Sequence, residues 1–213
     1  MKKIYIEFIG MPASGKSFYK KKIEKTLSKD KILTNNFNFL SKILKIFFFM
    51  MFLFRYTKLT IINLNFFFFT KNNNKEFKKH FYYFKNEAAL RIYHEIKKEI
   101  IINSEGFRHR AIYFIHENLK INKNFLYKNY INSLPKIDIL IYIRSNKRLN
   151  ISRSKKRKKS FKYNLEEIKI YKNKENIIKK ITKETKKKIF LIEFKRNQTD
   201  RNMNIFKKVI KKI

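Results

Sequence analysis

The segment Gly10–Ser17 reads GMPASGKS and follows a short run of β-branched and aromatic residues, Ile4–Ile9. It matches the pattern G-x-x-x-x-G-K-[ST] at every required position. In this pattern the two glycines let the backbone turn so that successive N–H groups point inward, and the next helix adds the positive end of its dipole. We therefore predict a strand over Ile4–Ile9, a helix from about Lys16, and a phosphate-binding loop between them.

The rarity of glycine strengthens this prediction. The chain has three glycines, Gly10, Gly15 and Gly106, and two of them occupy the required positions. A nucleoside triphosphate is the ligand that this loop predicts, with Lys16 at its β and γ phosphates and the Ser17 hydroxyl on Mg²⁺. We therefore expect ATP and Mg²⁺ as cofactors. The expected binding segment is Gly10, Met11, Pro12, Ala13, Ser14, Gly15, Lys16, Ser17 and Phe18.

Further short apolar runs alternate with helical patterns along the 213 residues. The runs predict strands over 32–34, 99–103, 137–143 and 189–194. Helices are expected over much of 40–100 (with loops near 63–65 and 71–74 and an amphipathic segment at 86–98), and over 106–119, 146–159, 165–186 and 204–213. Strands alternating with helices indicate an α/β fold in which a mostly parallel sheet lies between two helical layers. We expect one domain, 1–213.

The formal net charge is +37, and two interpretations of it remain open. Of the 53 basic residues 10 are Arg, so 43 are Lys, spread over the whole length among many Ile, Asn and Phe. A genome-wide preference for AT-rich codons explains this composition and is the interpretation we favour. A surface for nucleic acid or another polyanion is the alternative.

The sequence contains no cysteine, which excludes disulfides and thiolate metal sites and is compatible with the reducing cytoplasm. The longest apolar run, IFFFMMFLF at 46–54, is too short for a membrane span, which needs about 20 residues. We expect no integral membrane segment. Contact with a membrane surface stays open, because this run and Phe66–Phe69 lie among lysines.

Two blocks of sequence resemble the nucleoside and nucleotide kinase group of P-loop phosphotransferases, including the thymidylate-kinase-like and deoxynucleoside-kinase-like proteins. The first is IEFIGMPASGKS at 6–17, and the second is PKIDILIYIR at 135–144, which resembles the P-x-x-D-strand segment of these kinases. The resemblance implies the P-loop NTPase fold, a helical acceptor-side insertion at about 40–86, and a lid at about 146–164. It also implies that the protein transfers the γ-phosphoryl group of ATP to a small acceptor.

The resemblance implies that Arg153 and Arg157 form the R-x-x-x-R of the lid. Residues four apart share a helix face, so both guanidinium groups can stabilise charge on a transferring phosphoryl group. They are two of ten arginines in a chain that otherwise uses lysine. The alternative is a solvated basic face.

Glu105, in NSEGFRHR at 103–110, follows a predicted strand where these kinases often carry an acid. The resemblance implies that it orients Mg²⁺ or accepts the proton of the attacking hydroxyl. Helix capping is the alternative, and the aspartate expected one position earlier is replaced by Ser104. Arg108 and Arg110 are candidates for gripping an acceptor phosphate, whereas we expect His109 to be structural.

Arg55 and Arg91, in or just after the insertion, are further candidates for acceptor binding. The acceptor itself is not specified: a nucleotide, a nucleoside or another small metabolite would fit. We do not expect nucleic acid as a partner, and the oligomeric state is open. Two other functions remain as alternatives, an NTPase that acts on nucleic acid or membrane through its basic surface, and a catalytically inactive ATP-binding protein.

Overall fold

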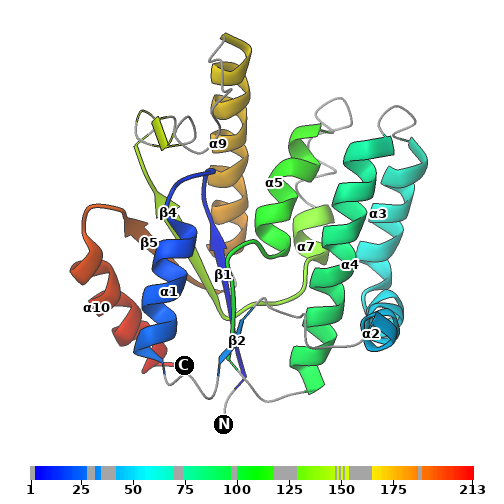
Figure 1. The fold of residues 1–213 in the computed structure, drawn as a ribbon, viewed down its shortest axis with the longest axis horizontal. Helices are drawn as coiled ribbons and strands as arrows, with labels where there is room; N and C mark the ends of the chain where they lie inside the picture. The colour runs from blue at the N-terminus through cyan, green and yellow to red at the C-terminus, as the bar shows by residue number, and fades with distance from the viewer. Residues whose placement is uncertain are drawn as a thin grey trace.

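The fold is a five-stranded sheet with helices on both faces (Figure 1). The computed structural model describes residues 3–27, 32–34, 42–69, 74–96, 100–117, 129–146, 148, 150, 152–153, 165–186 and 189–213. The strands are β1 (Ile4–Ile9), β2 (Ile32–Thr34), β3 (Ile100–Asn103), β4 (Ile139–Arg144) and β5 (Phe190–Lys195). The helices are α1 (Lys16–Thr26), α2 (Lys42–Arg55), α3 (Thr57–Phe69), α4 (Asn74–Ile96), α5 (Phe107–Glu117), α7 (Ile131–Ser133), α9 (Leu165–Lys186) and α10 (Thr199–Ile210).

The strand order is β2-β3-β1-β4-β5, and all four pairings are parallel. β1 is therefore the central strand. Because the strands run the same way, the loops after β1, β3, β4 and β5 meet at one edge of the sheet, where ligands bind in open α/β folds. The predicted three-layer α/β fold is confirmed, with a sheet that is wholly parallel.

β1 is buried along its whole length, as expected of a central parallel strand. Its side chains alternate between two cores, because successive residues of a strand point to opposite faces. Ile4, Ile6 and Phe8 join the core under α1 and α10, whereas Tyr5 and Ile9 join the larger core under α2, α4, α5 and α9. Figure 1 shows α1 and α10 on one side of the sheet and the other helices opposite them.

The predicted loop near 63–65 is wrong, because α3 continues through it. The Asn63 side chain donates a hydrogen bond to the carbonyl of Leu59 one turn earlier, at 2.7 Å. The amide is thus satisfied inside the helix and does not interrupt it. Of the loop expected over 71–74, Asn74 is instead the first residue of α4, and the rest lies outside the described residues.

Two other elements begin two or more residues away from the prediction. β4 begins at Ile139 and not at Ile137. α10 begins at Thr199, five residues before the predicted start at Asn204, with Asp200 in its first turn where an acid favours the helix dipole.

No single helix among the described residues is long and apolar enough to cross a membrane. α2 and the segment Thr57–Leu64 meet that composition only when taken together, and a bend of 99° separates them.

Candidate functional site

The predicted phosphate loop joins β1 to α1 at the carboxyl edge of the sheet. Gly15, the residue before α1, has φ 106, and Ala13 has φ 60. Both values lie in the left-handed region, which costs a non-glycine residue such as Ala13 about 1–3 kcal/mol. Left-handed residues in a turn aim backbone N–H groups into a concavity that fits an anion. The loop therefore has the backbone shape that its sequence predicts.

Gly10 is required for a different reason, close packing. A Cβ on this residue would lie 2.9 Å from the Ser14 hydroxyl oxygen and 3.0 Å from the Ile143 carbonyl oxygen of β4. The loop thus packs closely against β4. The Ser14 hydroxyl is fully buried and has no hydrogen-bond partner among the described residues, so the loop interior holds an unused polar group that can bind a ligand oxygen.

Lys16 lies folded over the loop. Its Nζ donates hydrogen bonds to the carbonyls of Gly10, at 3.1 Å, and Met11, at 3.2 Å, and the side chain is buried. The ammonium group is therefore already held at the loop, where the positive charge suits a triphosphate. Ser17 and Phe18 are exposed at the start of α1, so the Ser17 hydroxyl is accessible to a metal ion.

The donors at this edge fit Mg²⁺ only in part. Among the described residues no group of three or more His, Cys, Asp or Glu side chains could hold a metal ion. The Ser17 hydroxyl would be the ligand that the loop contributes, and phosphate oxygens and water would complete the shell, as is usual for Mg²⁺.

Arg196 also contacts this loop, although the sequence analysis did not identify it. It follows β5, and its Nη1 donates a hydrogen bond to the Ala13 carbonyl at 2.8 Å. Its guanidinium carbon would lie 3.5 Å from a Cβ on Gly15. A second cationic side chain thus joins Lys16 and the helix dipole at the predicted phosphate site. Its position two residues after the last predicted strand, 189–194, and the rarity of arginine are the signals that could have identified it.

Glu105 lies just after β3, at the same edge of the sheet. Its carboxylate forms an ion pair with Arg110 at 2.8 Å, and its backbone N–H donates to Asn103 Oδ1 at 3.0 Å. Nearly half of the Glu105 side chain is exposed, and the Arg110 guanidinium lies over the Tyr83 ring, 3.8 Å from its centre. An accessible carboxylate with a fixed arginine partner can accept a proton or orient water. The position of Glu105 is therefore compatible with its predicted role.

Glu87 of α4 is a second acid at this end of β3, and the sequence analysis missed it. Asn103, the last residue of β3, donates a hydrogen bond from Nδ2 to the Glu87 carboxyl. Burial, followed by the charge of Glu7, raises the pKa of Glu87 to about 8. A carboxyl group with a raised pKa, Glu87, thus lies beside the end of β3. The last residue of that strand, Asn103, carries an amide and not a carboxylate. No local spacing links residues 87 and 103, so nothing in the sequence indicates this contact.

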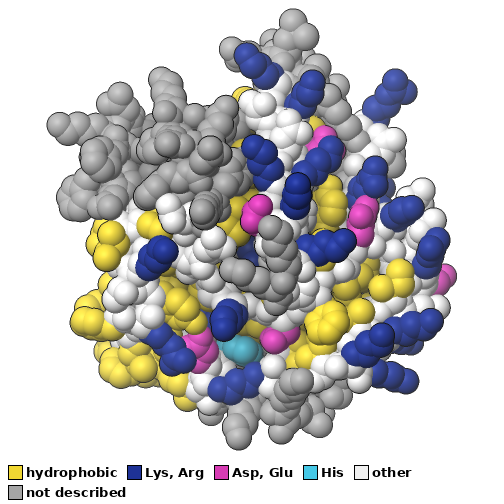
Figure 2. All heavy atoms as spheres, turned by 180° about the vertical axis from the view of Figure 1, so that it is seen from behind, with side chains coloured by type: hydrophobic (Ala, Val, Ile, Leu, Met, Phe, Trp, Pro, Cys, Tyr) yellow, Lys and Arg dark blue, Asp and Glu magenta, His cyan; other side chains and the backbone are white. Residues whose placement is uncertain are grey.

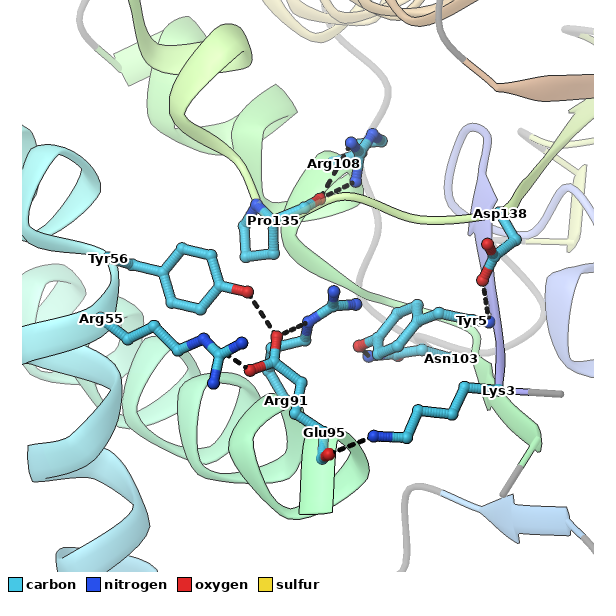
Figure 3. Close-up of polar contacts among 10 residues, drawn as sticks. All are labelled: Lys3, Tyr5, Arg55, Tyr56, Arg91, Glu95, Asn103, Arg108, Pro135 and Asp138. Carbon is cyan, nitrogen blue, oxygen red and sulfur yellow. Dashed lines mark hydrogen bonds and ion pairs between the residues drawn. The ribbon is translucent and has the colours of Figure 1, made fainter. Parts of the chain in front are cut away.

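Arg108 is a core residue and not a free phosphate ligand. It is buried, and its two Nη atoms each donate to the Pro135 carbonyl at 3.1 Å, as Figure 3 shows. Its backbone N–H and guanidinium also contact the Glu7 carboxylate, at 3.2 Å and 3.5 Å. The prediction that Arg108 grips an acceptor phosphate is therefore wrong. His109 is buried as well, and burial, followed by the charge of Lys16, lowers its pKa well below the usual value.

Arg55 and Arg91 lie together, both on Glu95 near the carboxyl end of α4 (Figure 3). Arg55 Nε is 3.0 Å from Glu95 Oε2, and Arg91 Nε is 2.9 Å from Oε1, which also accepts a hydrogen bond from the Tyr56 hydroxyl at 2.5 Å. Lys3, before β1, bonds to the Glu95 carbonyl, so this cluster lies near the amino ends of the strands. The structure does not bring Arg55 and Arg91 to the phosphate loop.

The lid prediction is only partly within the described residues. Arg157 lies outside them. Arg153 is half-buried, and its Nη1 has no hydrogen-bond partner among them. After β4, the Arg148 backbone N–H donates a hydrogen bond to Asn146 Oδ1 at 2.8 Å. Asn150 donates to the Ser145 and Tyr171 hydroxyls, at 2.6 Å and 2.8 Å.

Comparison with known proteins agrees with this geometry at the level of fold. No protein-family model and no curated protein sequence matches the chain. A structure of deoxyadenosine kinase from M. mycoides, with dCMP and dCDP bound, is similar with a TM-score of 0.59 and 16% identity, over 99% of this chain and 100% of that one.

Two thymidylate kinases are also similar. The enzyme from Candida albicans has a TM-score of 0.55 and 13% identity, over 99% of this chain and 92% of that one. The enzyme from Ehrlichia chaffeensis has a TM-score of 0.51 and 10% identity, over 97% and 98%. The chain therefore has the fold of the P-loop nucleoside and nucleotide kinases, as its phosphate loop and strand order indicate.

Proposed function

We propose that this protein is a cytoplasmic kinase that transfers the γ-phosphoryl group of ATP to a nucleoside, a nucleotide or another small metabolite. The observation that carries the proposal is the complete loop Gly10–Ser17, with Lys16 held inside it, at the carboxyl edge of a β2-β3-β1-β4-β5 sheet. The fold neighbours named above, which are deoxyadenosine and thymidylate kinases, support it.

In this proposal the loop N–H groups, Lys16 and Arg196 hold the phosphates. An acceptor oxygen attacks the γ-phosphorus, the bond from that phosphorus to the bridging oxygen breaks, and ADP leaves with the bonding electrons. Positive groups fixed around the transferring phosphoryl stabilise the charge that spreads over its oxygens. Mg²⁺, held by Ser17, would neutralise further phosphate charge.

Glu105 is the proposed acceptor of the hydroxyl proton, because it is accessible and lies at the carboxyl end of β3. Arg153 and Arg157 are proposed to close over the phosphates from the segment after β4. Where the acceptor is a phosphate and carries no proton at the reacting oxygen, Glu105 would instead orient water around the metal ion.

The experiment that tests the proposal is ATP-dependent phosphorylation of a panel of deoxynucleosides, nucleoside monophosphates and sugars, followed as ADP release and product mass. Lys16→Ala is the control, and ATP affinity is measured separately by calorimetry. Equal ATP binding by wild type and Lys16→Ala would show that the phosphate-loop assignment is wrong. ATP binding without turnover of any acceptor would argue against a kinase.

The net charge of +37 supports a second candidate, an NTPase that acts on a polyanion. This candidate differs from a kinase in two measurable ways. It hydrolyses ATP faster when nucleic acid or anionic vesicles are added, and its affinity for them falls steeply with salt. A kinase is expected to show no such stimulation.

A further inference from the structure

The turn that follows β5 carries Arg196, and a buried tyrosine of α1 contacts the backbone of this turn. The Tyr19 hydroxyl oxygen lies 3.0 Å from the Arg196 carbonyl oxygen and 3.3 Å from the Lys195 carbonyl oxygen. Tyr19 is fully buried, and its ring packs against Phe194 with the ring centres 4.9 Å apart. A phenylalanine would fill such an apolar site as well, and a buried hydroxyl is unfavourable unless it is hydrogen-bonded. Core packing alone therefore does not explain the hydroxyl group.

Asn202, in the first turn of α10, completes the network around this turn. Its Nδ2 donates to the Tyr19 hydroxyl at 2.8 Å and to the Lys195 carbonyl at 2.6 Å, and its Oδ1 accepts the Lys195 N–H at 3.3 Å. The Asn202 side chain is buried. An amide has two N–H donors and a hydroxyl has one O–H donor, so the Tyr19 proton remains available for the Arg196 carbonyl. The two side chains thus satisfy each other and fix the backbone of residues 195 and 196.

The side chain of Arg196 is attached to the same loop and helix that hold its backbone. Its Nη1 donates to the Ala13 carbonyl at 2.8 Å, and the Tyr19 N–H donates to the Gly15 carbonyl at 3.1 Å. Arg196 therefore bridges the phosphate loop and α1, with its guanidinium at Ala13 and its carbonyl at Tyr19. Ala13 has φ 60, and the guanidinium bond to its carbonyl opposes relaxation of this left-handed residue. Without the bond at Tyr19, the turn and the guanidinium would be free to move away from the loop.

Positive charge alone does not distinguish a triphosphate site in this chain. Of the 213 residues 53 are Lys or Arg, and Figure 2 shows such side chains scattered over one face of the molecule. A field of this kind attracts anions of every shape, and salt screens it. A site gains affinity over the rest of the surface when its cations are held in place before the ligand binds, because no ordering is then needed.

We infer that Tyr19 and Asn202 are positioning residues of the proposed ATP site. They hold the backbone of Arg196 so that its guanidinium lies on the phosphate loop before ATP binds. Both side chains are buried and act through Arg196, so they are not ligands of the nucleotide. This role rests on the proposed binding of ATP at Gly10–Ser17, and it does not depend on which acceptor is phosphorylated. It connects the first turn of α10 to the nucleotide site.

The alternative is that the network only joins α1 to α10. The two roles differ in the route by which a change at Tyr19 reaches the ligand. A positioning role runs through the Arg196 guanidinium, so it disappears when that group is removed. A purely structural role acts through the packing of α1 and is independent of the guanidinium.

The test begins with calorimetric titration of the full chain with ATP and Mg²⁺. Tyr19→Phe removes only the hydroxyl, and Asn202→Leu replaces the amide with an apolar group of similar size, so neither changes the charge of the site. We expect each to weaken ATP binding about threefold to tenfold, the usual effect of losing one hydrogen bond. Tyr56→Phe, which removes a hydroxyl bonded to Glu95 near the amino ends of the strands, is the matched control and should leave ATP affinity unchanged.

A double-mutant cycle with Arg196→Ala separates the two roles. In the Arg196→Ala background the guanidinium is absent, so Tyr19→Phe should weaken ATP binding by less than about twofold further. The backbone carbonyl of residue 196 is still present, so Tyr19→Phe should lower the free energy of unfolding, measured in urea, by a similar amount in both backgrounds. ATP affinity losses that multiply in the double variant would show that Tyr19 does not act through Arg196 and would overturn the inference.

Inorganic tripolyphosphate with Mg²⁺ is the second ligand. The guanidinium acts on phosphates, so Tyr19→Phe should weaken tripolyphosphate and ATP binding by the same factor, and an effect on ATP alone would contradict the inference. Circular dichroism establishes that each variant is folded, and Tyr19→Phe decides the test if Asn202→Leu does not fold. A wild type that does not bind ATP would overturn the proposed function as well. Normal ATP binding by Tyr19→Phe would overturn this inference alone.

Discussion

Gly106 is a glycine because of Glu7, a residue 99 positions earlier in the chain. A Cβ on Gly106 would lie 2.5 Å from the Glu7 carboxyl carbon and 2.6 Å from Oε1, although Gly106 itself has no left-handed backbone angle. The Glu7 carboxylate is fully buried and accepts the Arg108 backbone N–H at 3.2 Å. The third glycine of the chain therefore makes room for a buried carboxylate at the start of α5.

This contact predicts that Gly106→Ala destabilises the protein by about 1–3 kcal/mol, the usual cost of overpacking a close-packed site. Chemical denaturation measures the change. In a Glu7→Ala background the same substitution should cost much less, because the clashing carboxylate is gone. Equal costs in both backgrounds would show that the two residues are not coupled.

Arg196 predicts a link between the end of β5 and ATP binding. Arg196→Ala removes the hydrogen bond to the Ala13 carbonyl and one positive charge beside the phosphate loop. We expect ATP affinity to fall about tenfold, because the variant loses the proposed charge-assisted hydrogen bond to a phosphate oxygen, and such a bond contributes about 1.5–3 kcal/mol. Calorimetric titration with ATP tests this. Arg201→Ala, an exposed arginine of α10, is the matched control. Unchanged affinity in Arg196→Ala would limit this arginine to a structural role.

Glu87 predicts a pH dependence of stability. Its pKa is about 8 in the folded protein, against 4.5 for an ordinary glutamate, so between these values folding takes up a proton. The free energy of unfolding should therefore fall as pH rises from about 5 to 8, by up to about 1.4 kcal/mol per pH unit from this group.

Glu87→Gln keeps a carbonyl for Asn103 but cannot ionise. The variant should lose this decline and be more stable than wild type above pH 8, as measured by urea denaturation across pH. Glu184→Gln, an exposed glutamate of α9, serves as the control. His109 contributes in the opposite direction, because its lowered pKa costs stability as pH falls below about 6.5. Parallel pH profiles for wild type and Glu87→Gln would contradict the assignment.

Arg153 and Arg157 should affect turnover more than ATP affinity if they close over the phosphates. We expect Arg153→Ala and Arg157→Ala each to lower kcat by about tenfold to a hundredfold, with little change in ATP binding, because a lid group that acts on the transferring phosphoryl acts in the transition state. Steady-state kinetics with the acceptor found by the panel provides the measurement. Normal kcat in both variants would contradict the lid role and favour the alternative, in which the two arginines belong to a solvated basic face.

The sequence was sufficient for the strands and for the phosphate loop, because both depend on neighbouring residues. A central strand such as Ile4–Ile9 shows as an apolar run, and the loop needs fixed residue types at fixed spacing. The helix boundaries were predicted less well. Asn63 looked like a loop residue until the structure showed its amide bonded to Leu59 within α3.

The residues that the sequence did not reveal depend on contacts between distant segments. Arg196 reaches a loop 183 positions earlier, and Glu87 meets Asn103 from another element. Arg108 looked like an available cation, and only the fold shows that the Pro135 carbonyl and Glu7 bind it. For a buried charged residue, the sequence shows which chemical group is present. It does not show which distant residue binds that group.

Because β1 is the middle strand of the sheet, the later elements of the chain lie on two sides of the phosphate loop. β2, β3 and α2–α4 precede residue 104 and lie to one flank of the phosphate loop, whereas β4, the segment with Arg153, β5 and Arg196 follow residue 138 and lie to the other. In the proposed kinase, the elements that precede residue 104 would select the phosphoryl acceptor. The elements that follow residue 138 would help to bind ATP, the phosphoryl donor. Under that proposal, exchanging the segment 40–96 for that of a fold neighbour should transfer acceptor preference while leaving ATP affinity intact. Substrate choice could thus evolve without disturbing the nucleotide site.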